Sequence, residues 1–336
     1  MYTLDALDQF QVTKPENTYI YDIVPTAAGL ATISSDDVLR VLDPGNLSEK
    51  PLKEIKDVNK DVTCLKAVDP NGEAGAVIVA TAGREGKVRM WDLRTGSKVA
   101  EVAVDQNAPI LSLACSFPYA ITAGTELTNH QATVAMWDTR NLGQATIQYI
   151  ESHSDDVTEL GFHPSRPQIL LSGSTDGLVN IYNTTIADEE EALHQTINHG
   201  HSVHHAGFIT DTDIFALSHD ERFSMYELVT NPEEGMEEPS PVNFGDMREL
   251  LSGEYVANVL RRPDGGAVIG IGTHSRQSFD LVQLKKDPTW KFVPESKVTL
   301  SRAHGSEIVR SFCFLDSHKT VLTAGEDGQV KAWRGA

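Results

Sequence analysis

Small and apolar residues alternate with polar ones in short runs along the chain, and one such run recurs with little change. Its copies read ATISSDDVLRVLD at 31–43, ATAGREGKVRMWD at 80–92, LSGSTDGLVNIYN at 171–183 and LTAGEDGQVKAWR at 322–334. Each copy predicts a strand of small residues, a tight turn containing Asp or Gly, and a second, alternating strand. Further apolar runs, such as DVTCLKA at 61–67 and IVRSFCF at 308–314, predict a preceding third strand. Helical periodicity is confined to IADEEEALHQ at 186–195.

A pair of residues that closes the second strand recurs at intervals of 44 to 56 residues. The seven pairs are Leu42-Asp43, Trp91-Asp92, Trp137-Asp138, Tyr182-Asn183, Tyr226-Glu227, Val282-Gln283 and Trp333-Arg334. A period of about 45 residues that ends in Trp-Asp is typical of four-stranded WD-repeat blades. One small sheet cannot bury both faces, so several blades pack radially around a channel. The pattern predicts an all-β, seven-bladed WD-repeat β-propeller that occupies residues 1–336 as a single domain.

The two ends of the chain predict how the ring closes. The last unit reaches Trp333 at the end of its third strand, and the segment Asp5–Val12 has strand character. We therefore expect residues 1–12 to supply the missing fourth strand, which removes two exposed sheet edges. The sixth unit, at about 247–284, is the weakest because it lacks both the turn Asp and the Trp. An irregular acidic excursion is expected at about 229–245.

The net charge of the chain limits the classes of partner that it can bind. The 336 residues include 48 acidic and 28 basic side chains, a net charge of −20. Such a surface repels nucleic acid and anionic membranes, and it favours a protein partner with a Lys/Arg-rich segment. The same charge also serves solubility alone. Three cysteines exclude a disulfide scaffold, and neither a membrane span nor a secretory signal is visible. We expect a monomeric propeller in a reducing compartment.

Two units carry a His, a hydroxyl residue, an Asp and an aromatic residue at matching positions. These sets are His153, Ser172, Asp176 and Tyr182, and His304, Thr323, Asp327 and Trp333. A Ser-His-Asp set suggests a catalytic triad. Its recurrence at the turns of two units favours a buried hydrogen-bonded network that makes each turn rigid. With no phosphate-binding or dinucleotide motif in the sequence, we expect neither an enzyme nor a cofactor.

The stretch HGHSVHH at 199–205 brings four histidines together. A metal site is conceivable, since imidazole is a common ligand. However, consecutive strand residues point to opposite faces, so we expect His204 and His205 to diverge and no metal to bind. By alignment, His201 belongs to the turn network of its own unit. The nearby His219, Asp220 and Glu221 fit the repeated turn better than a site of acid–base chemistry.

Three groups of residues are candidates for partner binding. The first surrounds the channel mouth, where loops on a rigid scaffold commonly carry function; we assign to it Asp61, Arg84, Asp156, Thr175, His204, His219, Arg310 and Glu326. The second comprises acidic loops after the fourth and fifth units, which we expect to steer a basic partner: Asp188, Glu189, Glu190, Glu191, Glu233, Glu234, Glu237 and Glu238. The third is the pair Arg94 and Arg140 in two Trp-Asp-x-Arg motifs, which resemble the docking box for the adaptor of cullin-4 ubiquitin ligases.

Longer stretches resemble one family. ESHSDDVTELGFHPSRPQILLSGSTDGLVNIYNTTIADEEEAL at 151–193 is similar to the WD repeat-containing protein 89 family. So are SHDERF at 218–223, GDMREL at 245–250 and HGSEIVRSFCFLDSHKTVLTAGEDGQVKAW at 304–333. The resemblance implies a non-enzymatic propeller of the nucleus or cytoplasm with a link to ribosome assembly. Two functions stay open: charge favours a scaffold for a basic protein, which the resemblance would place in ribosome or ribonucleoprotein assembly, and the Trp-Asp-x-Arg pair favours the alternative, a substrate receptor of a cullin-4-type ubiquitin ligase.

Overall fold

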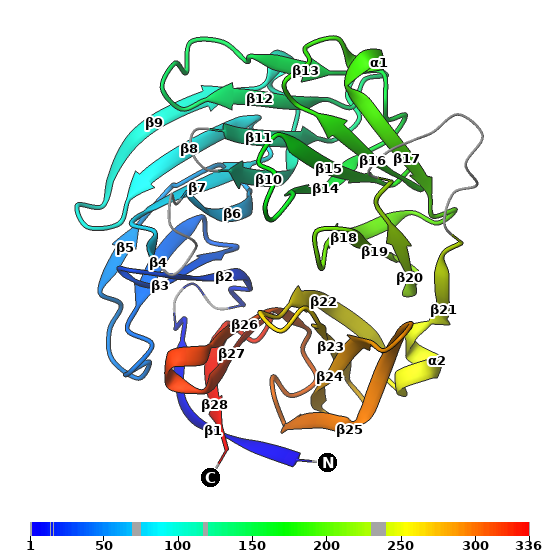
Figure 1. The fold of residues 1–336 in the computed structure, drawn as a ribbon. Coiled ribbons are helices and arrows are strands. Elements are labelled where there is room, and N and C mark those ends of the chain that lie inside the picture. Colours follow the sequence, from blue (N-terminus) through cyan, green and yellow to red (C-terminus); the bar gives the residue numbers. More distant parts are fainter. Residues whose placement is uncertain are drawn as a thin grey trace.

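The computed structural model describes residues 2–13, 15, 17–68, 75–116, 120–229 and 240–335. Its strands form five four-stranded sheets and one eight-stranded sheet. Figure 1 shows these sheets arranged as a ring of blades with their first strands innermost. The eight-stranded sheet holds two blades joined edge to edge, so the ring has seven blades. This confirms the predicted seven-bladed WD-repeat propeller.

The strands of the first four blades follow one another along the chain. Blade 1 comprises β2 (Ile20–Thr26), β3 (Gly29–Ser34), β4 (Val38–Leu42) and β5 (Lys53–Ile55). Blade 2 comprises β6 (Val62–Val68), β7 (Ile78–Gly83), β8 (Lys87–Asp92) and β9 (Ser97–Ala103). Blade 3 comprises β10 (Ile110–Ser116), β11 (Ala120–Thr125), β12 (Val134–Asp138) and β13 (Ile147–Tyr149). Blade 4 comprises β14 (Val157–Phe162), β15 (Ile169–Ser174), β16 (Leu178–Asn183) and β17 (Leu193–Asn198).

The last three blades keep this order until the chain ends meet. Blade 5 comprises β18 (Val203–Phe208), β19 (Asp213–Ser218), β20 (Arg222–Glu227) and β21 (Val242–Asp246). Blade 6 comprises β22 (Tyr255–Arg261), β23 (Ala267–Thr273), β24 (Ser278–Lys286) and β25 (Trp290–Ser301). Blade 7 comprises β26 (Val309–Leu315), β27 (Thr320–Gly325), β28 (Gln329–Arg334) and β1 (Tyr2–Gln11).

Helices are short in the described part of the chain. The predicted helical stretch 186–195 yields only α1 (Glu189–Ala192), because Leu193 already pairs with Tyr182 as the start of β17. A second helix, α2 (Met247–Leu251), precedes blade 6, so the first strand of that blade begins at Tyr255 rather than near 247. Single 3-10 turns lie at Asp105–Asn107 and Asp316–His318.

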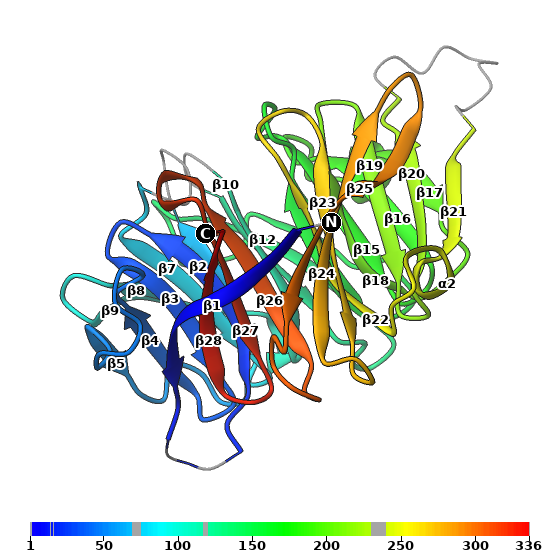
Figure 2. The same ribbon diagram turned by 90° about the horizontal axis from the view of Figure 1, so that it is seen from below.

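The N-terminal strand closes the ring, as predicted. Residues Asp5–Gln11 of β1 pair antiparallel with β28, and Phe10 and Val12 are buried in the core between blades 7 and 1. The sequence did not predict that Tyr2–Leu4 would continue across to β25 and pair with it in parallel. Figure 2 shows β1 running from blade 7 to the edge of blade 6. One strand thus joins the outer edges of two blades.

Candidate partner-binding site

The first strand of every blade contains a bulge at the same place. Pairing with the second strand skips one residue in each case, which breaks the alternation of side chains and redirects the skipped residue. The skipped residues are Tyr21, Thr63, Leu111, Thr158, His204, Ala257 and Arg310. All but Thr158 line a cavity of ≈ 660 Å³ at one mouth of the channel. The bulges therefore build this cavity from six blades.

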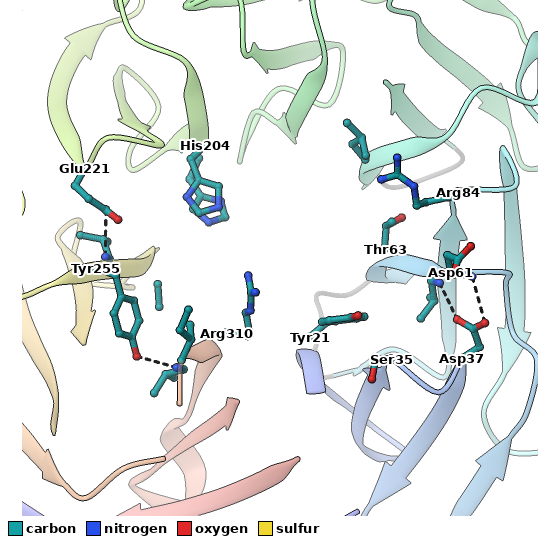
Figure 3. A pocket seen from close by; sticks show the side chains of 17 residues that line it. Tyr21, Ser35, Asp37, Asp61, Thr63, Arg84, His204, Glu221, Tyr255 and Arg310 are labelled. Carbon is teal, nitrogen blue, oxygen red and sulfur yellow. Dashed lines mark hydrogen bonds between the residues drawn. The ribbon is translucent and has the colours of Figure 1, made fainter. Parts of the chain in front are cut away.

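Other polar side chains complete the cavity. Figure 3 shows Ser35, Asp37 and Arg84 on one side and Glu221 and Tyr255 on the other. The Tyr255 hydroxyl accepts a 2.8 Å hydrogen bond from the backbone N–H of Val309 in the next blade. Burial raises the pKa of Tyr255 to about 12, so the hydroxyl stays protonated. The wall is thus a mixture of hydroxyl, carboxyl and cationic groups fixed by contacts between blades.

The eight mouth residues predicted from the sequence divide into two sets. Four of them line the cavity: Asp61, Arg84, His204 and Arg310. The other four are not among the lining residues of the cavity: Asp156, Thr175, His219 and Glu326. Asp156 accepts a 2.8 Å hydrogen bond from the backbone of Leu127, and its own carbonyl accepts one from Thr175. Sequence reasoning missed Tyr21, Asp37, Thr63, Glu221 and Tyr255, which all line the cavity.

Both arginines of the cavity are neutralised by nearby carboxylates. Arg84 donates to Glu126 of the neighbouring blade, and Arg310 Nε donates to Glu326 Oε1 at 2.8 Å within its own blade. The carboxylate of Asp61, in contrast, is exposed and makes no hydrogen bond or ion pair with another described residue. The balance of unpaired charge at the mouth is therefore negative.

Three imidazoles stack on one side of the cavity. The ring of His204 lies 4.1 Å from that of His205 and 4.6 Å from that of His219, between centroids. The expectation that His204 and His205 point to opposite faces is wrong, because the bulge at His204 breaks the alternation. Burial lowers the pKa of His204 to about 2, and the nearby His205, His219 and Arg310 act in the same direction. His204 is therefore neutral at physiological pH.

The rest of the histidine-rich stretch is used in packing. His205 Nδ1 donates to Glu159 at 2.8 Å in the preceding blade. His199 is buried and hydrogen-bonded to the Tyr226 hydroxyl at 2.9 Å. His201 pairs with the turn residue Asp220 at 3.2 Å but remains partly exposed. Among the described residues, no group of three or more His, Cys, Asp or Glu side chains is arranged to hold a metal ion.

The two matching residue sets lie where the repeat places them. His153 Nδ1 donates to Asp176 at 3.0 Å, and its Nε2 is 2.7 Å from Ser172 Oγ, which donates to Tyr182. In blade 7, His304 contacts Asp327 at 2.7 Å and Thr323 at 2.8 Å, and Trp333 donates to Thr323. Both sets are almost fully enclosed, so they hold turns together and offer no approach for a substrate.

The first acidic loop is partly used in structure. Asp188 caps α1 by accepting from Glu191 N, and Glu189 accepts from the backbone of Ile150 and Ser152. Glu190 and Glu191 remain exposed. Figure 1 shows α1 at the outer rim of the ring, away from the channel. Four residues of the second predicted loop lie outside the described residues: Glu233, Glu234, Glu237 and Glu238.

The two Trp-Asp-x-Arg motifs end the third strands of blades 2 and 3. Arg94 pairs with Asp92 at 2.7 Å and Arg140 with Asp138 at 2.6 Å, with side chains 65% and 64% exposed. Arg248 pairs with Asp246 at 2.6 Å in the same way, although no Trp precedes that pair. The ion pair is therefore a local property of Asp-x-Arg rather than of the Trp-Asp repeat.

The comparisons with known proteins agree with this geometry. The model of the WD domain, G-beta repeat, matches residues 49–92, 144–183 and 295–334. The uncharacterized WD repeat-containing protein YNL035C of Saccharomyces cerevisiae is 36% identical over 91% of this chain and 75% of its own. Uncharacterized WD repeat-containing protein C63.06 of Schizosaccharomyces pombe is 30% identical over 98% of this chain and 99% of its own.

The chain therefore belongs to the WD repeat-containing proteins, which use the propeller as a scaffold. The WD repeat-containing protein 89 homolog of Dictyostelium discoideum is 24% identical over 95% of this chain and 83% of its own. In the described part of the chain, no helix has the length and apolar character to cross a membrane.

Proposed function

We propose that this propeller is a non-enzymatic scaffold whose channel mouth binds a Lys/Arg-rich segment of a protein partner. The observation that carries the proposal is the charge balance of the cavity. Its two arginines are paired with carboxylates, whereas the side-chain carboxylate of Asp61 and one carboxylate oxygen of Glu221 make no hydrogen bond or ion pair with other described residues. Within a chain of net charge −20, such a concave site attracts cationic side chains.

We further propose that the chain is a nuclear or cytoplasmic relative of the WD repeat-containing protein 89 family that acts in ribosome or ribonucleoprotein assembly. The support is the motif resemblance of blades 4 and 7 and the 24% identity to the Dictyostelium homolog. Proteins that contact RNA phosphates carry Lys/Arg-rich segments, so they have the chemistry that this mouth selects. Before such a segment binds RNA, an acidic scaffold can neutralise its positive charge.

Zero-length cross-linking of carboxylates to lysines, followed by mass spectrometry, tests the site. Leu111 lines the cavity, so Leu111→Arg places a cation in it. Leu250→Arg makes the same change on the exposed surface of α2 and serves as the control. We expect partner lysines to cross-link to Asp61 or Glu221 in wild type and in Leu250→Arg, and not in Leu111→Arg. Cross-links confined to other surfaces would contradict the proposal.

The second candidate, a substrate receptor of a cullin-4-type ligase, is favoured by one observation. Arg94 and Arg140 follow the third strands of adjacent blades, so they lie at the same end of the ring with exposed guanidinium groups. The test is adaptor binding by an Arg94→Glu/Arg140→Glu variant, with Arg248→Glu as a control that breaks an Asp-x-Arg ion pair elsewhere in the chain. Loss of adaptor binding in the double variant alone would support this candidate, and binding of adaptor by neither wild type nor control would exclude it.

A further inference from the structure

Two turns at the mouth carry a carboxylate where other blades have glycine. The third turn residue is Gly86, Gly177 or Gly328 in blades 2, 4 and 7, each with positive φ. Blade 1 has Asp37 there, at φ 58°, and blade 5 has Glu221, at φ 66°. A side chain in this left-handed conformation costs free energy that glycine avoids, and such strain concentrates at functional or clamping positions. These two carboxylates are therefore the natural pair to compare.

Both carboxylates bond to the backbone of the next blade, but to different extents. Asp37 uses both oxygens: Oδ1 accepts from Val62 N at 2.9 Å and Oδ2 from Asp61 N at 3.2 Å. Glu221 uses only Oε2, which accepts from Val256 N at 3.1 Å. Its Oε1 makes no hydrogen bond with any described residue, and Figure 3 shows the side chain reaching into the cavity wall. Glu221 thus keeps one acceptor available at the cavity.

The surroundings of Glu221 disfavour its charge while the cavity is empty. Burial, reinforced by Asp246 at the start of α2, raises the pKa of Glu221 to about 7. The N–H of Val256, Arg248 of α2 and His205 of β18 oppose this rise without cancelling it. His204 and Tyr255 line the same cavity from β18 and β22. A cation beside Oε1 would stabilise the ionised carboxylate and supply a hydrogen-bond donor to this oxygen.

We propose that Glu221 is the subsite that receives one lysine side chain of the partner's basic segment. This inference rests on the proposed function and specifies its ligand. Lysine fits better than arginine. Arginine gains most from a bidentate pair with both carboxylate oxygens, and Glu221 Oε2 already accepts a hydrogen bond from the N–H of Val256. An ammonium group needs a single acceptor and is a compact point charge that enters a cavity of this kind.

Binding of fluorescent decalysine and decaarginine, measured by anisotropy at pH 8, tests the subsite. The variant is Glu221→Gln, and Asp37→Asn is the matched control, with the same turn position and the same change in net charge. We expect Glu221→Gln to weaken decalysine binding about 10-fold and decaarginine binding less than about 3-fold. Asp37→Asn removes the same charge from the cavity wall, so it should weaken decalysine and decaarginine binding to the same extent and by less than about 3-fold, because both Asp37 oxygens already accept backbone N–H groups.

The pH dependence gives an independent measure. Wild-type affinity for decalysine should rise about 10-fold from pH 6 to pH 8 as Glu221 ionises, and Glu221→Gln should lose that rise while retaining any contribution from the histidines. Equal losses in Glu221→Gln and Asp37→Asn, or equal effects of Glu221→Gln on both peptides, would overturn the lysine subsite. If decalysine binding depends on Leu111→Arg but not on Glu221→Gln, the subsite fails and the proposed function stands. If neither variant alters binding, both fail.

Discussion

At the scale of single residues, blades secure the same turn with different chemistry. Blade 4 uses the imidazole of His153 on Asp176. Blade 1 has no such histidine; there the buried guanidinium of Arg40 donates to Ser34 at 2.6 Å and to Asp36 at 2.5 Å. A guanidinium from the strand after the turn thus replaces an imidazole from the loop before the blade. The requirement is a donor for the turn carboxylate, and the residue type is secondary.

Removing a turn carboxylate should therefore destabilise the fold. Asp176→Ala leaves the buried His153 without its acceptor and removes bonds from the backbone of Ser154 and Leu178. We expect the free energy of unfolding to fall by roughly 1–3 kcal/mol, measured by urea denaturation. Asp327→Ala should cost a similar amount, since its contacts with His304 match. A loss of partner binding at unchanged stability would instead indicate a functional role for Asp176.

The stability contribution of Glu221 should depend on pH. Burial raises the pKa of Glu221 from its ordinary value of 4.5 to about 7, so the folded state holds the proton more tightly. Stability contributed by this proton is fully present below about pH 4.5 and is lost as pH rises through 7. We expect Glu221→Gln to raise the melting temperature relative to wild type more at pH 8 than at pH 5. A difference that is constant across this range would mean that Glu221 titrates normally.

At the scale of elements, the sequence predicts the blades well because their signals are local. The Asp-Gly turns and the Trp-Asp ends lie within single hairpins, and the unpaired third strand of the last unit predicts closure by β1. The cavity lining depends on bulges, which arise where a first strand meets its neighbours in the ring. The group predicted from the sequence therefore mixes two kinds of position. Asp61 and Asp156 precede a bulge, whereas His204 and Arg310 are themselves the skipped residues of a bulge.

A signal for the missed residues does exist in the chain. Each bulge follows a buried Val or Ile in the first or second position of the first strand, at Ile20, Val62, Ile110, Val157, Val203, Val256 and Val309. The residue after this position is the one that turns toward the mouth. Glu221 was visible as a turn residue, but its exposure to the cavity depends on how blades 5 and 6 pack. That packing brings Val256 to one oxygen and leaves the other open.

Deleting residues 1–12 should destabilise the whole ring, because β1 pairs with β28 and buries Phe10 and Val12. Each buried apolar side chain is worth about 1.5–3 kcal/mol, so we expect the melting temperature to fall by more than about 5 °C. Deleting residues 1–4 removes only the parallel pairing with β25 and should cost less. Differential scanning calorimetry of both truncations measures this. Unchanged melting after the longer deletion would contradict closure by β1.

At the scale of the whole molecule, attraction of a basic partner depends on where the acidic side chains lie as much as on how many there are. The exposed Glu190 and Glu191 of α1 lie at the outer rim, three strands from the channel. Strands in a sheet are about 4.8 Å apart, which makes a separation of about 14 Å. The Debye length is about 8 Å at physiological ionic strength. Attraction from this loop is therefore largely screened at the mouth, and the charge of the mouth itself must direct a basic segment.

Association rates of decalysine, measured by stopped-flow fluorescence against salt, test this distribution. At about 0.15 M salt we expect Asp61→Lys to slow association at least threefold, because the exposed carboxylate lies in the cavity wall. Neutralising the α1 loop by changing Glu190 and Glu191 to Gln should change the rate less than about twofold. At about 0.01 M salt the Debye length reaches about 30 Å, and the loop variant should then slow association as well.

Asp156→Lys is a poorer probe than Asp61→Lys, because the carboxylate of Asp156 accepts a hydrogen bond from the backbone of Leu127. A rate that is insensitive to salt, or one that responds to the loop variant but not to Asp61→Lys, would place the approach of basic partners elsewhere on the ring.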